Sequence, residues 1–411
     1  MNTKLYEDAD RIVSHTLKAI LPDQAVREAL SGFTAPAGRT VLVAVGKAAW
    51  QMASAALKEI TADQGIVITK YGHSKGPLAN CRIREAGHPV LDENSLKAAA
   101  DALSLVEGLK EDDTVLFLLS GGASALFELP LVPLETLQDL NRQLLACGAS
   151  IEEINTLRKR LSAVKGGRFA LKCSPAKVFS IVLSDILGDP LDMIGSGPAY
   201  PDSSTCEDAL RIVDKYSLRV DEKTLALLKE ETPKKLDNVT TLLAGNIAIL
   251  CRKAEEICRK LGYETRILNT ALQGEARTAG KELAEKAVQL AKEKHSKIAL
   301  IEGGETVVTL RGNGLGGRNQ ELVLAAVETL AGQPAAVFSL GSDGTDGPTD
   351  AAGAYADGDT LSAMKEKGID PAQYLADNDS YHAFEAIGQL LITGPTGTNI
   401  NDLTVALIDN T

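Results

Sequence analysis

The chain has 411 residues, 44% of them hydrophobic, and its 55 acidic residues outnumber 43 basic ones to give a net charge of −12. This charge argues against nucleic acid or an anionic membrane as the main partner, because both attract a basic surface. No run of about 18 apolar residues is present, so no transmembrane helix is predicted. The six cysteines form no CxxC pair, which favours a reduced, cytoplasmic enzyme over a disulfide framework or a zinc site.

Short apolar runs alternate with helical patterns along the first half of the chain. The opening segment, 1–20, predicts an amphipathic helix and contains acidic residues, unlike a signal peptide. Continuous apolar strands between helices are typical of a parallel sheet covered on both faces. The predicted strands are 39–46, 64–70, 113–125 and 176–189, and the predicted helices are 47–60, 92–109 and the helical stretch 205–230.

The polar segment KEETPKKLDN (229–238) is the predicted domain boundary, since chains longer than about 250–300 residues usually divide. We therefore expect two α/β domains, 1–235 and 236–411. Ligands bind such sheets at the carboxyl ends of the strands. In the second domain the predicted strands are 240–245, 264–268, 297–304, 306–312, 335–341 and 403–409, with helices at 246–262, 274–294 and 318–331.

Lys47 lies in the first turn after the first strand, in AVGKAAW. A lysine is unfavourable at a helix N-terminus because the helix dipole repels cations there. A bound anion between helix and lysine would remove this conflict, whereas the alternative is a surface lysine that reaches sideways. The loop is not a Walker A motif, since Ala48 stands where Ser or Thr would hold magnesium.

The loop LLSGGASALFELP ends the strongly apolar strand 113–125 with small residues. Small residues allow backbone N–H groups to approach a phosphate closely, although a tight βα turn uses the same residue types. The candidate phosphate-binding residues are Ser120, Gly121, Gly122, Ala123 and Ser124.

A dense basic cluster follows in NTLRKRLSAVKGGRFA. We expect most of its cations on a solvated helix face and one or two in the active site. Asp185, in the polar end of the predicted strand segment 176–189, is a candidate base or metal ligand, and a helix cap is the alternative. The cations of the cluster are Arg158, Lys159, Arg160, Lys165 and Arg168.

The segment RGNGLGGRNQE contains a GxGxxG pattern, which is also a dinucleotide fingerprint. Its leading strand is not continuously apolar, and Arg318 and Asn319 follow, which places a charged donor at the pyrophosphate position. Backbone amides and a guanidinium that bind a triphosphate explain these features better. Gly314, Gly316 and Gly317 are the candidate amide donors.

Polar residues follow two further predicted strands, 335–341 and 297–304, and precede the last one, 403–409. SLGSDGTDGPTDAAGA contains Asp343, Asp346 and Asp350, which indicate either a turn-rich loop or a metal site. We expect Asp343, then Asp346, in the active site, and Asp350 as a structural cap. The other residues noted are Glu302 and Glu305 in IEGGETVV, and Thr396, Thr398, Asn399 and Asp402 in TGPTGTNINDL.

Together these segments resemble the glycerate 2-kinase family (class II glycerate kinase, with a C-terminal MOFRL domain). The motifs that carry the resemblance are AVGKAA, GHPVLDENS, LLSGGASAL, NTLRKRLSAVKGGRFA, LSDILGD with IGSGPAYPDSST, GGETVVTLRGNGLGGRNQEL, GSDGTDGPTDAAGA and ITGPTGTNINDL. They extend over almost the whole chain in one order. Ala123 departs from the family pattern, which often has a third glycine there.

The resemblance implies an N-terminal Rossmann-like parallel sheet sandwiched by helices, a C-terminal MOFRL α/β domain and an active site in the cleft between them. It implies phosphorylation of D-glycerate on its 2-hydroxyl by ATP with Mg²⁺, giving 2-phosphoglycerate and ADP. Lys47 and Arg318 match the family's proposed catalytic pair. As hypotheses, Asp185 is the third catalytic residue, Asp343, Glu305 and Asp346 are metal ligands, and Thr396 and Asn319 bind the nucleotide.

Two other functions stay open at this point. One is an NAD(P)H-dependent hydroxypyruvate reductase, which only the imperfect GxGxxG pattern supports. The other is a non-catalytic protein that binds a sugar acid or a nucleotide. The sequence also leaves the oligomeric state open, including a homodimer.

Overall fold

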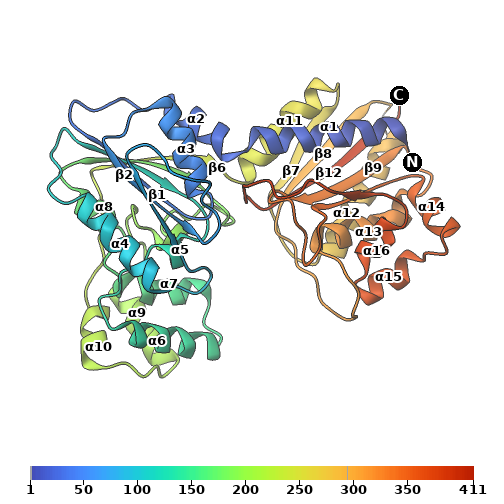
Figure 1. Cartoon of the computed structure of the whole chain (residues 1–411). Coiled ribbons are helices and arrows are strands. Elements are labelled where there is room, and N and C mark those ends of the chain that lie inside the picture. The colour runs from blue at the N-terminus through green and yellow to red at the C-terminus, as the bar shows by residue number, and fades with distance from the viewer. Residues whose placement is uncertain (1, 294) are drawn as a thin grey trace. The chain divides into compact units, whose positions relative to one another are not determined.

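The computed structural model describes residues 2–293 and 295–411, which form two compact units (Figure 1). One unit contains Pro22–Ser184 and Asp189–Ala244. The other contains the N-terminal segment up to Leu21, Asp185–Gly188 and Gly245–Thr411. The units divide the chain differently from the expected ranges 1–235 and 236–411, because the first helix belongs to the C-terminal unit. Residue 294, the expected end of helix 274–294, lies outside the described residues.

The N-terminal unit is built on a six-stranded sheet in the order β3-β2-β1-β4-β5-β6. The first five strands in this order are all parallel to one another. β1 and β4 are buried at every position, as their continuous apolar runs predict. β3, which alternates charged and apolar residues, was not predicted. β6 was expected to open the second domain but is instead the edge strand of this sheet. The strands are β1 (Thr40–Val45), β2 (Gln64–Lys70), β3 (Cys81–Ala86), β4 (Thr114–Leu119), β5 (Lys177–Leu183) and β6 (Val239–Gly245).

Helices cover both faces of this sheet (Figure 1). α2 (Pro22–Leu30) and α3 (Ala49–Glu59) pack on alternate residues of β1 and β4. On the other face, Phe169 of α8 (Arg168–Cys173) packs against Phe117 of β4, and α4 (Glu93–Leu105) contacts β2 and β3.

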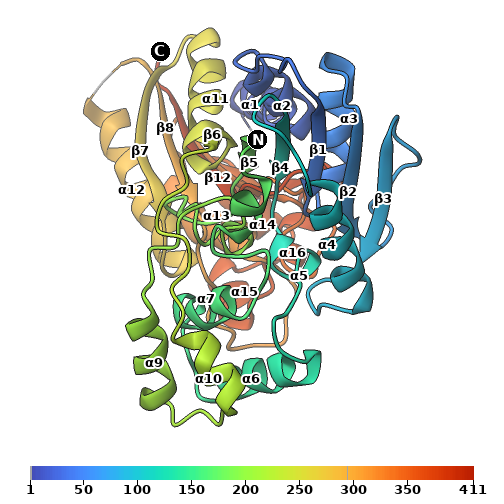
Figure 2. The ribbon, with the colours of Figure 1, turned by 90° about the vertical axis from the view of Figure 1, so that its left-hand side faces the viewer.

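A separate apolar cluster joins four helices beside the sheet, α6 (Leu134–Ala146), α7 (Ile151–Arg160), α9 (Cys206–Lys215) and α10 (Glu222–Leu228) (Figure 2). Two short elements complete the unit. They are α5 (Ala123–Leu126) and the 3₁₀ helix η1 (Ile194–Ser196).

The C-terminal unit contains a mixed six-stranded sheet in the order β11-β10-β9-β12-β8-β7. β7 and β8 are parallel, whereas β12 is antiparallel to both β8 and β9. The expected strand at 306–312 is wrong: the segment is a loop with one isolated bridge between Val307 and Glu275. The strands are β7 (Glu264–Leu272), β8 (Lys297–Gly304), β9 (Ala335–Gly341), β10 (Gly353–Asp357), β11 (Leu390–Leu391) and β12 (Asp402–Asp409).

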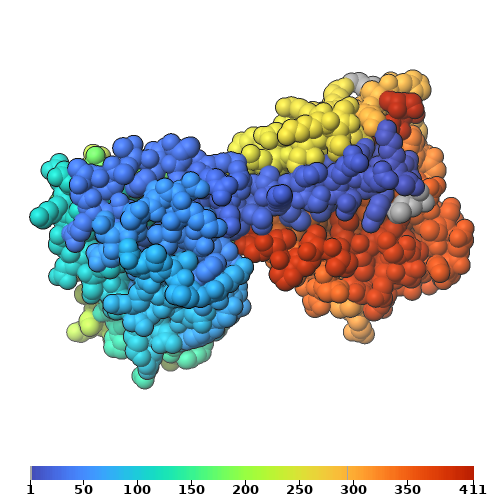
Figure 3. All heavy atoms as spheres, turned by 45° about the horizontal axis from the view of Figure 1, so that its top comes forward, coloured from blue at the N-terminus to red at the C-terminus, as the bar shows by residue number. Residues whose placement is uncertain are grey.

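Two helices lie on each face of the mixed sheet. α1 (Thr3–Ala19) packs beside α11 (Ile247–Lys260) on one face, and Figure 3 shows it along the surface of this unit. α12 (Ala276–Glu293) and α13 (Arg318–Leu330) pack on the other face. The short helices α14 (Thr360–Glu366), α15 (Pro371–Asp377) and α16 (Ser380–Glu385) extend that layer. Within the described residues, each helix is too short or too polar to cross a membrane.

Candidate active site

Lys47 is held against the small-residue loop that follows β4. Its backbone N–H donates to the carbonyl oxygen of Gly121 over 2.9 Å, and the Ala48 N–H donates to Ser120 Oγ over 3.1 Å. Gly46 has a φ of 125°, and a Cβ there would collide with Ser120. The structure therefore brings together the loops after β1 and β4, because neighbouring parallel strands end at the same edge of the sheet.

Gly122 makes room for two side chains at this loop. It has a φ of 88°, and a Cβ would lie 3.1 Å from the His88 ring and 3.2 Å from Lys47 Cγ. Burial, and next the charge of Lys47, lower the pKa of His88, so the imidazole is neutral at pH 7. His88 belongs to GHPVLDENS, but sequence reasoning gave this residue no role, since nothing local indicates that the segment after β3 reaches the loop after β4.

The far end of the same loop is fixed by buried polar contacts. Lys165 Nζ donates to the carbonyl oxygens of Ser124 and Phe127 over 2.8 and 3.0 Å and pairs with Glu128 at 3.3 Å. Burial lowers the pKa of Lys165 to about 8, although Glu128 opposes the shift. Ser196 Oγ lies 3.3 Å from Ser124 Oγ and donates to Asn155 Oδ1 over 3.0 Å. The 120–124 loop is thus a braced element with fixed backbone positions.

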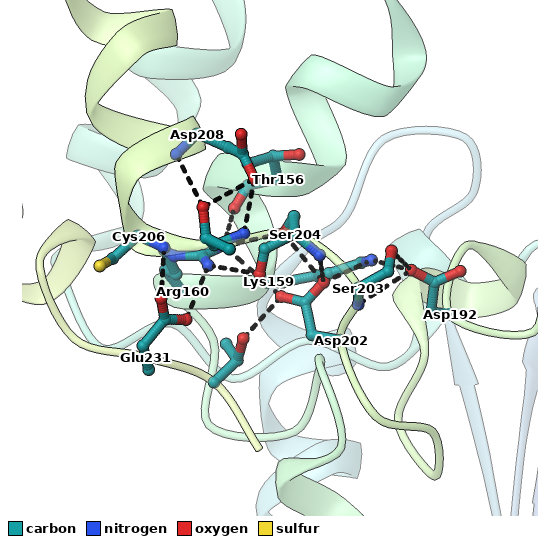
Figure 4. Close-up of polar contacts among 12 residues, drawn as sticks. Thr156, Lys159, Arg160, Asp192, Asp202, Ser203, Ser204, Cys206, Asp208 and Glu231 are labelled. Carbon is teal, nitrogen blue, oxygen red and sulfur yellow. Dashed lines mark hydrogen bonds and ion pairs between the residues drawn. The ribbon is translucent and has the colours of Figure 1, made fainter. Parts of the chain in front are cut away.

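The expectation of a solvated basic face for 155–168 is wrong. Lys159 and Arg160 are buried, at 1% and 0% exposure, because acidic residues from later in the chain pair with them. Lys159 Nζ lies 3.0 Å from carboxylate oxygens of Asp192 and Asp202. Arg160 donates to the carbonyls of Thr156 and Ser204 and pairs with Asp202 and Glu231 (Figure 4). These cations stabilise the fold and are not available to a substrate.

Asp185 comes two residues after β5 ends and is half-buried. It lies in Asp185–Gly188, the short segment that clusters with the C-terminal unit, while the strand before it belongs to the N-terminal unit.

In the C-terminal unit, Arg318 begins α13 and is held by two carboxylates. Its Nε and Nη2 donate to the two oxygens of Asp402 over 2.5 and 3.0 Å, and Nη1 donates to Glu305 over 3.0 Å. Burial raises the pKa of Asp402 to about 6, and the Arg318 hydrogen bonds only partly offset this. The guanidinium is therefore aimed by a bidentate pair and stays 35% exposed.

Asp402 reaches Arg318 because of the direction of the last strand. In the sheet it pairs with Gly304 of β8 and Gly341 of β9, so the start of β12 lies at the carboxyl ends of both. A Cβ on Gly341 would lie 3.3 Å from Asp343 Oδ1 and 3.6 Å from Asp402 Oδ1. Asp402 was noted in the sequence without a role, because strand direction cannot be read from a single apolar run.

Asp346 caps α13. Its carboxylate accepts from the backbone N–H groups of Asn319 and Gln320 over 3.1 and 2.9 Å and from both of their side chains. Burial raises its pKa against these hydrogen bonds. These four hydrogen bonds occupy both oxygens of the Asp346 carboxylate. We therefore interpret Asp346 as a helix cap and propose other carboxylates as the metal ligands. Asp343 differs: within the described residues its Oδ1 accepts from the N–H and hydroxyl of Thr345, and its Oδ2 accepts no hydrogen bond.

The glycines of the GxGxxG pattern approach protein rather than a dinucleotide. The Gly314 N–H donates to the Asp377 carbonyl over 2.8 Å, and a Cβ on Gly314 would lie 2.6 Å from Asp379 Cα. Gly316 packs on Ser380, and Gly317 packs on Asp346. The Gly314 amide is thus already used, whereas the amides of Gly316 and Gly317 have no partner among residues 2–293 and 295–411. Thr396 donates to the Ser342 carbonyl over 2.6 Å, beside Asp343.

A cavity of about 810 Å³ opens beside Arg318. Glu305 and the glycines Gly312, Gly314, Gly316 and Gly317 form its polar wall. Further polar lining residues are Gln273, Thr306, Asn313, Glu321 and Asn378. Two of the apolar lining residues, Val307 and Leu310, are 58% and 79% exposed. The apolar lining residues are Leu187, Val307, Val308, Leu310 and Pro348.

Comparisons with known proteins agree with this arrangement. Residues 8–229 match the model described as Domain of unknown function (DUF4147), and residues 298–402 match the MOFRL family. The chain is 53% identical to the D-glycerate 2-kinase of Thermotoga maritima over 97% of both chains. It is 40% identical to the glycerate 2-kinase of Pyrococcus horikoshii, over 90% of this chain and 88% of that one.

A solved structure shares the fold. The crystal structure of glycerate kinase from Thermotoga maritima has a TM-score of 0.94 and 52% identity, over 98% of this chain and 99% of that one. Both units therefore have the fold of this enzyme, with the MOFRL domain at the C-terminus. The chain belongs to the glycerate 2-kinase family.

Proposed function

We propose that this chain is an ATP-dependent D-glycerate 2-kinase, which transfers the γ-phosphoryl group to the 2-hydroxyl and yields 2-phosphoglycerate and ADP. The observation that carries the proposal is an arginine, Arg318, aimed by a bidentate carboxylate at the mouth of a glycine-rich cavity. Phosphoryl transfer needs positioning and charge neutralisation rather than covalent chemistry. The identity to a D-glycerate 2-kinase supports the substrate.

The cavity beside Arg318 fits a nucleotide in volume and lining. Ligand sites of about 300–1,000 Å³ with mostly apolar walls and a few polar groups are typical for small molecules. In our proposal the nucleoside lies against Val307 and Leu310, and the phosphates lie toward Arg318 and the amides of Gly316 and Gly317. This assignment also explains why two large apolar side chains are exposed to solvent.

The residues present fit a magnesium ion that is held mainly by phosphate oxygens. Among the described residues there is no cluster of three or more metal-ligating side chains. Mg²⁺ in kinases is usually bound by one or two carboxylates together with substrate phosphates. Asp343, which has one carboxylate oxygen without a partner among the described residues, and the half-exposed Glu305 would hold it. When bound, the ion would neutralise charge on the phosphates.

We further propose roles for the other site residues. Lys47 and Arg318 neutralise the oxygens of the transferring phosphoryl group. The braced 120–124 loop presents backbone amides to an anion, and Asp185 accepts the proton of the 2-hydroxyl. Asn319 and Thr396 support the site indirectly, since their side chains already contact Asp346 and the Ser342 carbonyl.

Phosphorus NMR of the purified protein with ATP, Mg²⁺ and D-glycerate tests the proposal. We expect a new phosphate monoester signal and ADP in equal amounts. Hydroxypyruvate with NADH is the parallel reaction, and loss of NADH absorbance there without any phosphoryl transfer would replace our proposal by a reductase. A reductase has less support, since the Gly314 amide already has a protein partner and β8 ends at Gly304, well before the glycine loop.

A further inference from the structure

One cation of the basic cluster, Arg158, has no partner among the residues that the structure describes. Arg168 donates to the carbonyl oxygens of Lys159, Arg160 and Ser162, and the other three cations are paired as described above. The Arg158 guanidinium forms no hydrogen bond or ion pair within the described part of the chain, and its Nε is buried. Burial lowers the pKa of Arg158 against the opposing charge of Glu128, yet arginine remains protonated in proteins.

Arg158 lies on the side of α7 that faces the 120–124 loop. Residues three apart share a helix face, and Asn155, one turn earlier, is linked through Ser196 to Ser124 Oγ. The charge of Arg158 also lowers the pKa of Lys165, whose Nζ bonds the Ser124 carbonyl. The unpaired guanidinium therefore lies near the loop that holds Lys47 in place.

Within the described part of the chain, Glu128 is the anion that acts on Arg158, and it also pairs with Lys165 at 3.3 Å. Glu128 is fully buried and its carboxylate oxygens accept no hydrogen bond there. One carboxylate therefore faces two cations, which leaves a positive charge uncompensated. A buried donor without a partner is costly, most of all on a charged group, so the unpaired Arg158 Nε indicates a ligand with negative charge. The nearby hydroxyl and amide groups of Ser124, Ser196 and Asn155 suit a small, hydroxylated acid.

We propose that Arg158 binds the carboxylate of the hydroxy-acid substrate and thereby selects acids over neutral polyols. The planar guanidinium fork matches a carboxylate with two parallel hydrogen bonds. This inference rests on the proposed function, because the acid it names is the substrate of that reaction. Lys47 and Arg318 bind the phosphoryl group, and Arg158 sets the position of the acceptor.

The test compares Arg158→Gln and Arg158→Lys with Arg142→Gln, an exposed arginine on α6 that pairs only with Asp139. We expect Arg158→Gln to raise KM for D-glycerate by about 10–100-fold, since each charged hydrogen bond is worth about 1.5–3 kcal/mol. KM for ATP and the Arg142→Gln variant should stay at wild-type values. The preference for D-glycerate over glycerol should fall by the same factor.

Calorimetric titration with D-glycerate alone separates this inference from the proposed function. We expect D-glycerate to bind the wild type and to bind Arg158→Gln about 10–100-fold more weakly. If Arg158→Gln does not fold, the affinity of Arg158→Lys, which keeps the charge, is compared with that of the wild type instead. If the wild type binds D-glycerate but transfers no phosphate, the proposed function fails and the role of Arg158 stands. Unchanged KM values, a parallel rise of KM for ATP, or no binding to the wild type would overturn the inference.

Discussion

The Arg318–Asp402 pair gives the sharpest prediction, because its two partners differ in exposure. The Arg318 side chain is 35% exposed, whereas that of Asp402 is 7% exposed. Removal of one partner from a fully buried pair costs about 3–5 kcal/mol. Arg318→Met leaves Asp402 buried without its partner. Since water reaches this pair, we expect the free energy of unfolding to fall by about 2–3 kcal/mol at pH 8. Asp402→Asn leaves an arginine that water can solvate, so we expect its free energy of unfolding to fall by about 1 kcal/mol or less.

The pH dependence follows from the raised pKa of Asp402, from 3.8 to about 6. The folded protein holds this proton more tightly than the unfolded chain, so ionisation of Asp402 lowers stability as pH rises from about 4 to 6, by about 1.4 kcal/mol per pKa unit. Without Arg318 this pKa rises further. Arg318→Met should therefore be less destabilised at pH 5, where Asp402 is protonated, than at pH 8.

Urea unfolding of the wild type and both variants at pH 5 and pH 8 measures these differences, and kcat is measured on the same preparations. Asp402→Asn should lower kcat by about 10–100-fold, because one charged hydrogen bond that aims Arg318 is lost. We also expect the wild-type kcat to fall below about pH 6, where Asp402 becomes protonated, and this fall should be absent in Asp402→Asn. Equal destabilisation of Arg318→Met at both pH values, or wild-type kcat in Asp402→Asn, would refute the reasoning.

Three further substitutions test single contacts. Lys47→Ala should lower kcat by about 100-fold or more, while Lys58→Ala, an exposed lysine of α3, keeps wild-type kcat; equal rates in both would remove Lys47 from the mechanism. Asp346→Ala should cost about 1–2 kcal/mol in urea unfolding through loss of the α13 cap and leave the Mg²⁺ requirement unchanged; a shifted requirement would restore its metal role. Gly314→Ala should cost about 1–3 kcal/mol, because its Cβ would overlap Asp379, whereas Gly32→Ala, whose Cβ would lie 3.8 Å from its nearest neighbour, should be near neutral; equal melting temperatures would contradict the packing explanation.

Local patterns predicted the residues that follow parallel strands. Lys47 and Ser120–Ser124 were expected at one sheet edge because β1 and β4 are continuous apolar runs, and adjacent parallel strands end together. This prediction requires only that the strands are parallel and that their carboxyl ends lie at the same edge of the sheet. It therefore holds for the N-terminal unit without knowledge of any long-range contact.

Residues whose roles depend on distant partners were not predicted. Lys159 and Arg160 have the sequence pattern of a solvated helix face. Their burial is possible because carboxylates from later in the chain, above all Asp202, offset the cost of removing their charges from water. Asp402 lies beside Arg318 only because β12 runs antiparallel to β8 and β9. The polar segment 306–312 has strand-like residues, but its amides are satisfied elsewhere: Arg311 and Gly312 donate to Asn378.

The central claim is phosphorylation of D-glycerate at its 2-hydroxyl, and the fate of the product tests it most directly. The reaction with ATP and Mg²⁺ is coupled to enolase without any phosphoglycerate mutase, and phosphoenolpyruvate is measured. We predict immediate formation of phosphoenolpyruvate, because enolase uses the 2-phosphate. Product that enolase consumes only after mutase is added would show transfer to the 3-hydroxyl and contradict the account.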